Sequence, residues 1–461
     1  MTIFHHQRRH ELDQLVEDYT RRDISRRSFI QRAMTVGLTA SSASALLAAC
    51  SSSATSDNSE QGANIDLITT WSGDDATSFD KVKAPFEQKN NVTINVKSTP
   101  DMNATLAARL KANNPPDIAV LPNPVQMQQL AAQNKLKPLS SFIDMTQLKK
   151  DYPQFWIDLG TYQSQLYAIF YKVVNKGTIW YNPTQFQQNN YETPRTWNEL
   201  ISLSDKIANK GQYPWSIGVE DGATSGWLAA DWVAQIFLNQ SGPDLYDQWV
   251  QHKIPWTHSA VKNAFQSFGQ IVGGKHYVNG APQSVLTTNF QQTAYDPYSN
   301  PPHAYMVYMG DFVESFITAQ YPNATPGTDF NFFHFPELNS QYTNSMIGGA
   351  DVVVALKDND IVHQFMQYLA TADTQAIWVK RGGFTTVNNS VDLNAYPNEI
   401  TKASAQMLAT AQTFRIGAGD MIPSAVQTAF WKGLLSFISD QSQLNSILNT
   451  IESTAKASYT Q

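Results

Sequence analysis

The sequence predicts an α/β fold whose core is an open, mainly parallel sheet with helices on both faces. Apolar strand-like runs at 65–70, 92–96 and 118–121 alternate with helical patterns that end near Phe86 and Lys111. This β-α-β-α-β alternation favours a parallel sheet, because parallel strands need a crossover connection. The chain has 461 residues, which is too long for one compact core and suits two lobes.

Later segments extend this pattern. The stretch 165–182 has the apolar, turn-punctuated character of a crossing between lobes. Thr196, followed three residues later by Glu199, predicts the N-terminus of a helix with a capping box. A further strand is expected at 351–356, and the pattern from 361 onward is mostly helical. We find no internal repeat.

The N-terminal segment has the features of an export signal. Arg26 and Arg27 precede a small-residue apolar run that ends in Leu47-Ala48-Ala49-Cys50. The paired arginines resemble a twin-arginine signal, and Leu-Ala-Ala-Cys resembles a lipoprotein cleavage box. The alternatives are an uncleaved anchor or an amphipathic cytosolic segment. The run is too short and too rich in Ser and Thr for a typical membrane-spanning helix. Residues 1–49 are therefore expected to be a twin-arginine lipoprotein signal peptide.

Cys50 is the only cysteine, and it lies where lipidation requires it. Two or three acyl chains at this residue would anchor the protein stably to the outer face of the cytoplasmic membrane. Residues 50–63 are polar and Ser-rich, so they are expected to form a tether. The fold that follows cannot contain an internal disulfide.

The amino-acid composition narrows the range of possible functions. Residues 1–49 hold 7 of the 32 basic and 5 of the 39 acidic residues, which leaves a net charge of −9 for the remainder. A protein without a surplus of basic residues binds nucleic acid poorly, because it has little positive charge to neutralise the phosphates. Aromatic residues make up 11%, and 11 Trp and 19 Tyr supply flat apolar faces with one polar atom each. Such side chains suit a pocket for a ligand with CH faces and hydroxyls.

Several stretches resemble the extracellular solute-binding protein family 1, the sugar receptors of ABC importers of the maltose-binding-protein type. In chain order they are Asn114-Pro115-Pro116-Asp117-Ile118, Leu136–Leu139, Leu166-Tyr167-Ala168, Trp180-Tyr181-Asn182-Pro183, Thr196–Leu200 and Gly348-Gly349-Ala350-Asp351. Others resemble the alpha-glucoside-binding branch: Leu121-Pro122-Asn123-Pro124, Gly218–Trp227, Asp231-Trp232 and Lys432 after Phe430-Trp431. The resemblance rests on their order along residues 64–461.

The resemblance implies a two-lobed periplasmic-binding-protein fold of type II, with each lobe a mainly parallel sheet flanked by helices and the ligand cleft at the hinge. Lobe one is expected at 64–172 plus 305–356, and lobe two at 179–300 plus 357–461. The implied function is capture of an oligosaccharide, an alpha-glucoside in particular, by hinge closure and its delivery to ABC permease subunits. The implied protein is a monomer and not an enzyme.

Candidate ligand-binding residues follow predicted strands or open helices. In lobe one, Trp71 is equally suited to stacking on a sugar and to packing, while Asp74 and Asp75 suit a ligand or a helix cap. Asn123, held between two prolines, suits a ligand contact or a turn. Gly349 permits close approach of the backbone to a ligand, although a strand-entry turn is the alternative.

Further candidates come from a Gly-rich segment and from later parts of the chain. Carboxylates accept hydrogen bonds from neighbouring hydroxyls, and aromatic rings stack on sugar faces. Trp180 and Trp431 suit a buried core better than a stacking platform, and Arg381 suits the surface equally well. The remaining candidates are Glu220, Asp221, Trp227, Asp231, Asp351, Arg381, Phe384, Trp180 and Trp431.

Two other function classes stay open. An exported glycoside-acting enzyme needs only two carboxylates, and Glu220 with Asp231 is one such pair. Against an enzyme, the sequence lacks a Gly-x-Ser-x-Gly elbow and a His-Glu-x-x-His motif. The nine histidines show no spacing typical of ligands, so neither a cofactor nor a metal is expected. A receptor for a non-sugar solute, such as a polyamine or phosphate, is the second alternative. A polyamine would suit the acidic charge, whereas a phosphate site would need Arg, Lys or helix N-termini in the cleft.

Overall fold

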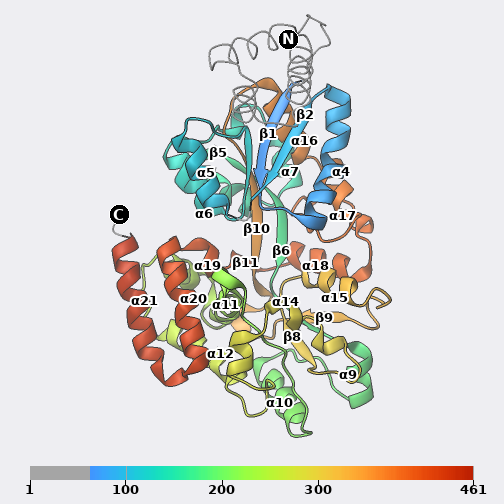
Figure 1. The fold of residues 1–461 in the computed structure, drawn as a ribbon, viewed down its shortest axis with the longest axis vertical. Coiled ribbons are helices and arrows are strands. Elements are labelled where there is room, and N and C mark those ends of the chain that lie inside the picture. The colour runs from blue at the N-terminus through green and yellow to red at the C-terminus, as the bar shows by residue number, and fades with distance from the viewer. Residues whose placement is uncertain (1–62, 100, 460–461) are drawn as a thin grey trace, which may run out of the picture. The chain divides into compact units, whose positions relative to one another are not determined.

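The computed structural model describes residues 63–99 and 101–459. The expected signal peptide, Cys50 and nearly all of the tether lie outside these residues. Two groups of strands organise the described chain, and each is covered by helices (Figure 1). We call the part built on the six-stranded sheet lobe one, and the part built on the three-stranded sheet lobe two.

Lobe one contains the sheet predicted from the sequence. Its strands are β1 (Asn64–Thr69), β2 (Thr93–Ser98), β3 (Ile118–Leu121), β6 (Ala168–Asn175), β10 (Ser345–Ala355) and β11 (Thr413–Ile416). β1 pairs in parallel with both β2 and β3, as the alternation predicts. β10 runs antiparallel to β3 and β6, so the sheet is mixed. The two-residue strands β4 (Thr161–Tyr162) and β5 (Gln165–Leu166) form a separate hairpin.

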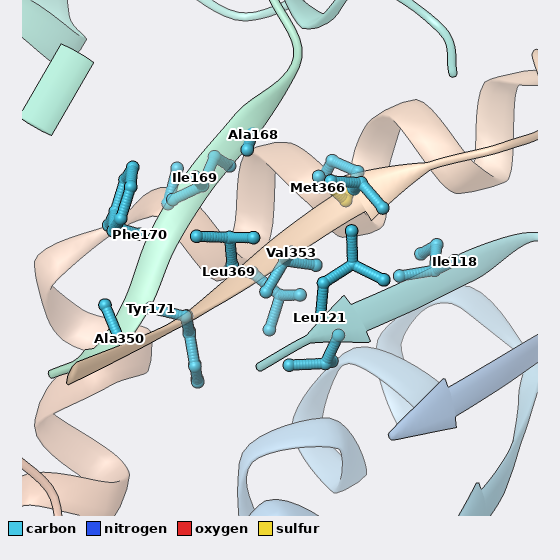
Figure 2. Packing of buried hydrophobic residues seen from close by; sticks show 14 of the residues in the cluster. Ile118, Leu121, Ala168, Ile169, Phe170, Tyr171, Ala350, Val353, Met366 and Leu369 are labelled. Atoms are coloured by element: carbon cyan, nitrogen blue, oxygen red, sulfur yellow. The ribbon is translucent and has the colours of Figure 1, made fainter. Parts of the chain in front are cut away.

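Helices cover this sheet because each carries an apolar face. They are α4 (Gly73–Asn90), α5 (Met102–Lys111), α6 (Pro124–Ala132), α7 (Met145–Asp151), α8 (Gln154–Leu159), α16 (Asp360–Ala370) and α17 (Ala372–Val379). Figure 2 shows Met366 and Leu369 of α16 beside Ile169 of β6 and Val353 of β10, and all four are at most 2% exposed. Burial of aliphatic side chains of this size contributes roughly 1.5–3 kcal/mol each.

Lobe two is built on a small antiparallel sheet. β7 (Thr178–Tyr181) lies between β8 (Met306–Tyr308) and β9 (Asn331–His334), and both pairings are antiparallel. This differs from the mainly parallel sheet expected for each lobe. The reason is that β8 and β9 return to β7 from distant parts of the chain, without the regular strand–helix–strand spacing that signals parallel pairing.

The helices of lobe two outnumber its strands. They are α9 (Pro183–Asn189), α10 (Trp197–Ala208), α11 (Trp227–Val250), α12 (Ser259–Val272), α13 (Gln283–Thr287), α14 (Phe290–Thr293), α15 (Val313–Gln320), α19 (Ala418–Met421), α20 (Ser424–Ser439) and α21 (Leu444–Tyr459). α18 (Glu399–Ala409) lies between the lobes, because its Ile400 packs with residues of lobe two and its Ala405 and Met407 pack in the core of lobe one. The predicted capping box is confirmed: Thr196 Oγ1 accepts from the N–H of Glu199, whose carboxylate accepts from the N–H of Thr196.

The chain is divided between the lobes differently from the expected division. β8 and β9 pair with β7, so the segment 306–334 belongs to lobe two, although we expected it in lobe one. Conversely, α16 and α17 pack on the core of lobe one, although we expected them in lobe two. The physical reason is that the apolar face of α16 packs on β6 and β10, while α17 packs on α4 and α16. No local sequence pattern marks the point at which the chain returns to lobe one.

The crossing expected within 165–182 is present as the step from β6 to β7. At its start, the N–H of Asn175 donates to Asp311 Oδ1 at 3.2 Å, and the N–H of Asp311 donates to the carbonyl oxygen of Asn175 at 2.9 Å. Hydroxyls of Thr385 and Ser404 donate to the other carboxylate oxygen of Asp311. Asp311 therefore joins three separate chain segments beside the crossing.

Candidate functional site

Charged side chains gather on one face of the β6–β10 pair and beside the end of β6. Lys172 and Val174 alternate along β6, so their side chains share one face of the strand, and Lys176 continues the alternation directly after the strand ends. The side chains of both lysines are 12% exposed. On β10, Asp351 pairs in register with Lys172, and Gly349 pairs with Val174. A Cβ on Gly349 would lie 3.6 Å from Cε of Lys176, which places this glycine next to the lysine side chain.

Each lysine lies close to two carboxylates. Lys172 Nζ lies 2.6 Å from Asp75 Oδ2, and its charge also acts on Asp351. Lys176 Nζ lies 2.8 Å from Asp231 Oδ2 and 3.9 Å from Asp420 Oδ2. Charged groups this buried need partners, since removing them from water costs several kcal/mol.

Burial shapes the titration of these carboxyls. It raises the pKa of Asp231 to about 6, although the ammonium of Lys176 acts in the opposite direction. It also raises the pKa of Asp351 to about 6, against the charge of Lys172. Burial raises the pKa of Asp420 as well. For Lys176, burial alone would lower the pKa, but Asp231 and Asp420 outweigh it and the pKa is raised.

A pocket of about 240 Å³ lies beside Lys176. It is lined by Lys176, Asp221, Thr224, Trp227, Ala230, Asp231, Gly419, Asp420 and Trp431. We call it the acidic pocket. Four sequence-predicted candidates meet here: Asp221, Trp227, Asp231 and Trp431. The combination of carboxylates, one ammonium and two indoles provides hydrogen-bond acceptors, donors and flat apolar faces.

Local backbone geometry explains how the two tryptophans come together. Gly226 is the N-cap of α11 with φ of +103°, a conformation that L side chains rarely adopt. A Cβ at Gly226 would lie 2.9 Å from the carbonyl oxygen of Trp431, so only glycine lets the loop approach α20 this closely. Trp227 follows directly, and its indole N–H donates to Asp221 at 3.0 Å.

A second group of candidates lies in lobe one near the start of α4. Trp71 is 3% exposed, packs at 4.9 Å against Trp378, and donates its indole N–H to Asp351 at 2.7 Å. Phe384 is also buried and stacks on Trp378. These contacts give both rings a packing role in this structure.

The polar residues near α4 lie closer to solvent. Asp74 is exposed in the first turn of α4, where a carboxylate favours the helix N-terminus. Asp75 pairs with Lys172 as described. Arg381 is exposed, and its Nε donates to Ser78 at 3.0 Å.

Three candidates lie apart from the acidic pocket. Trp180 is fully buried in lobe two, and its N–H donates to Thr178 and to the carbonyl oxygen of Met309. Glu220 accepts from the N–H of Gly222 and from Asn289, and these donors lower its pKa. Asn123 caps α6, its side chain accepting from the N–H of Gln126.

Asn123 also lines a second hollow, of about 430 Å³, between α5 and α6 on one side and α19 and α20 on the other. This hollow shares Gly419 and Asp420 with the acidic pocket. Within the described residues, no group of three or more His, Cys, Asp or Glu is arranged to hold a metal ion. None of the described helices has the length and apolar character that spanning a membrane requires.

Sequence reasoning missed Lys172, Lys176 and Asp420. A signal for the two lysines was present, because they interrupt the apolar run Ala168–Gly177 at positions four apart and therefore share a strand face. Asp420 lies in the short segment Ala418–Met421, which carries no comparable pattern.

Two lobes joined by long strands, with a polar, aromatic-lined pocket beside the crossing, define a solute-binding receptor. The chain belongs to the bacterial extracellular solute-binding protein family, whose model matches residues 81–414.

Two relatives agree with this membership, and one solved structure shares the fold. The chain is 30% identical to the osmoprotective compounds-binding protein GgtB of Synechocystis sp., over 85% of this chain and 92% of that protein. It is 32% identical to the alpha-glucosides-binding periplasmic protein AglE of Rhizobium meliloti, over 83% of this chain and 85% of that protein. The bacterial solute receptor AcbH has the same fold, with a TM-score of 0.74 at 20% identity, over 86% of this chain and 100% of that chain.

Proposed function

We propose that this protein is the substrate-binding receptor of an ABC transporter for an oligosaccharide, and specifically for an alpha-glucoside. The acidic pocket is the observation that carries this proposal. Its carboxylates accept hydrogen bonds from sugar hydroxyls, its ammonium donates to them, and Trp227 and Trp431 provide apolar faces for the ring CH groups. The two relatives named for alpha-glucosides and osmoprotective compounds support a ligand of this class.

Capture is proposed to occur by closure of the two lobes about the crossing strands. Ligand favours the closed form only through contacts that are absent from the open form. Asn123 lines the hollow between α6 and α20, and we propose that it supplies such a contact from lobe one. The closed form then delivers the sugar to the permease. The receptor carries out no chemistry itself, and it acts as a monomer.

We further propose that export uses the twin-arginine segment and that Cys50 carries the lipid anchor. The support is the order of the paired arginines, apolar run and Leu47-Ala48-Ala49-Cys50 in the sequence. The receptor would then work at the outer face of the cytoplasmic membrane.

A polyamine receptor is the second candidate, because one observation favours it. The pocket lining contains three carboxylates, from Asp221, Asp231 and Asp420, and a single ammonium, a charge excess that suits a cationic ligand. A thermal-shift panel separates the two proposals. A ligand that binds only the folded protein raises the melting temperature. Stabilisation by maltose or trehalose supports the sugar receptor, and stabilisation by spermidine alone supports the polyamine receptor.

A further inference from the structure

Lys176 connects the acidic pocket to the crossing between the lobes. Its backbone lies between the end of β6 and the start of β7, and its N–H donates to the carbonyl oxygen of Ile347 in β10 at 3.1 Å. The residue is thus held in the strand pair that runs from one lobe to the other. Its side chain extends from there into the pocket.

The ammonium of Lys176 lies close to three residues of the pocket wall, which come from α11 and α19. It lies 2.8 Å from Asp231 of α11 and 3.9 Å from Asp420 of α19. It also lies 5.5 Å from the ring centroid of Trp227, within the range of a cation–π contact. The Lys176 side chain is 12% exposed and that of Asp231 is 8% exposed, so this pair is largely shielded from water.

Lys176 differs from the other residues that line the acidic pocket in charge and in position. Among the residues that line the acidic pocket, it alone bears a cationic side chain, and it alone lies in the crossing. An ammonium carries three N–H donors. Lys176 Nζ donates one hydrogen bond to Asp231 Oδ1 at 3.1 Å, whereas Asp420 at 3.9 Å lies beyond hydrogen-bond distance. A sugar hydroxyl oxygen in the pocket is a suitable acceptor for a further N–H.

We propose that Lys176 is a positioning residue that couples ligand in the acidic pocket to the geometry of the crossing, by donating a hydrogen bond to a ligand hydroxyl. This inference rests on the proposed sugar-receptor function. Hydroxyls of the ligand donate hydrogen bonds to the carboxylates of Asp231 and Asp420. These bonds replace part of the electrostatic stabilisation that the Lys176 ammonium gives the two carboxylates. The ammonium then moves toward the ligand, and the strand that carries it follows.

The position of α19 explains how this movement reaches both lobes. α19 carries Asp420 and contacts α11 in lobe two as well as α6 in lobe one. A ligand that changes the contact between Lys176 and Asp420 therefore acts at a point where both lobes meet. Such differential contacts are what a ligand needs to shift an equilibrium between open and closed forms.

The test compares the purified wild-type protein with Lys176→Met, Lys176→Arg and the control Lys357→Met. Lys357 forms an ion pair with Asp117 and lines none of the hollows described above. Maltose and trehalose affinity is measured by calorimetry, and ligand-induced compaction by the X-ray scattering radius of gyration. We expect Lys176→Met to lose at least tenfold in affinity and to lose compaction at saturating sugar. Lys176→Arg should restore part of both, and Lys357→Met should match wild type.

Other outcomes overturn the inference. If Lys176→Met binds sugar and compacts as wild type does, Lys176 does not couple ligand binding to closure of the lobes. If its affinity falls but full compaction remains at saturating sugar, Lys176 only contacts the ligand. If Lys176→Met does not fold, Asp420→Asn, which keeps the Lys176–Asp231 pair, must reduce compaction for the inference to stand. If wild type itself binds no sugar, the proposed function fails and the inference fails with it.

Discussion

The indole N–H of Trp227 donates to the carboxylate of Asp221 at 3.0 Å, and the same carboxylate oxygen accepts from the hydroxyl of Thr224. The ring also packs nearly perpendicular to Phe290, with 5.1 Å between centroids. These contacts fix the orientation of the indole at the pocket wall before any ligand arrives. A preoriented aromatic face loses little conformational freedom on binding.

Trp227→Ala is therefore expected to weaken sugar binding by about 1–3 kcal/mol, a factor of roughly 5 to 150, because a stacking face and its cation–π contact with Lys176 are lost. Calorimetric titration measures the effect. Trp256→Phe is the control, because Trp256 is fully buried in the core of lobe two. Unchanged affinity in Trp227→Ala would place the ligand elsewhere.

Asp231→Ala is expected to destabilise the fold by about 3–5 kcal/mol, because it leaves the buried ammonium of Lys176 without its nearest carboxylate. Urea unfolding measures the loss. The double variant Lys176→Met/Asp231→Leu removes both charges and should recover much of the stability. A double variant no more stable than Asp231→Ala would show that the pair is not what stabilises this region.

Glu314 predicts a dependence of stability on pH. Burial raises its pKa to about 7, although Asn398 donates to it, and the nearby charge of Asp311 raises the pKa further. The folded protein thus holds this proton more tightly than the unfolded chain, whose carboxyl titrates near 4.5. The contribution of Glu314 to stability is complete below pH 4.5 and is lost as the pH rises through 7.

Glu314→Gln cannot titrate, so its stability relative to wild type should increase from pH 5 to pH 8, by at most about 3 kcal/mol. Urea unfolding at both pH values measures this difference. Glu199→Gln is the control, since backbone N–H groups of Arg195 and Thr196 lower the pKa of Glu199. The contribution of Glu199 to stability changes only at pH values near and below 4.5. The stability difference between Glu199→Gln and wild type should therefore stay constant from pH 5 to pH 8. A pH-independent difference for Glu314→Gln would contradict the assignment.

Gly226→Ala is expected to lower stability by more than Gly327→Ala. Both glycines have positive φ, at +103° and +82°, so each alanine costs about 1 kcal/mol of backbone strain. At Gly226 the new Cβ also meets the carbonyl oxygen of Trp431 at 2.9 Å, whereas the space around Gly327 is open. Thermal unfolding measures both. Equal losses would mean that α20 moves freely away from this loop.

Cys50→Ser tests the proposed lipid anchor. The variant should appear in the soluble fraction after export and should lack the mass of the acyl chains, because serine cannot form the thioether. Fractionation and mass spectrometry measure these outcomes. Arg26→Lys/Arg27→Lys is the companion variant and should block export while leaving Cys50 intact. Membrane retention and an unchanged mass in Cys50→Ser would contradict lipidation at this residue.

The first sheet was predictable because its elements are local. β1, β2 and β3 are separated by one helix each, and their runs of apolar residues are bounded by polar turns. The pairing of β10 with β6 was not predictable in this way. Val353 and Ile169 lie opposite each other although almost two hundred residues separate them, and no local pattern records such a partner.

The lining of the acidic pocket was predictable where loop chemistry marks it. Asp221, Trp227 and Asp231 lie in one Gly-rich stretch that opens a helix, and all three line the acidic pocket. Trp71 has the same kind of position after a strand, yet Trp378 and Asp351 enclose it. Whether Trp71 is packed or exposed depends on partners about three hundred residues away in the sequence. Sequence alone does not reveal such partners.

Calorimetric titration of the purified protein with maltose, trehalose, sucrose, maltotriose, glucose, xylobiose and spermidine tests the central claim most directly, with each sugar recovered and checked for cleavage. We predict that an alpha-glucoside binds most tightly, with one site per chain, and is recovered intact. Absence of binding by every sugar would contradict the sugar-receptor proposal. Recovery of hydrolysis products would instead identify an enzyme.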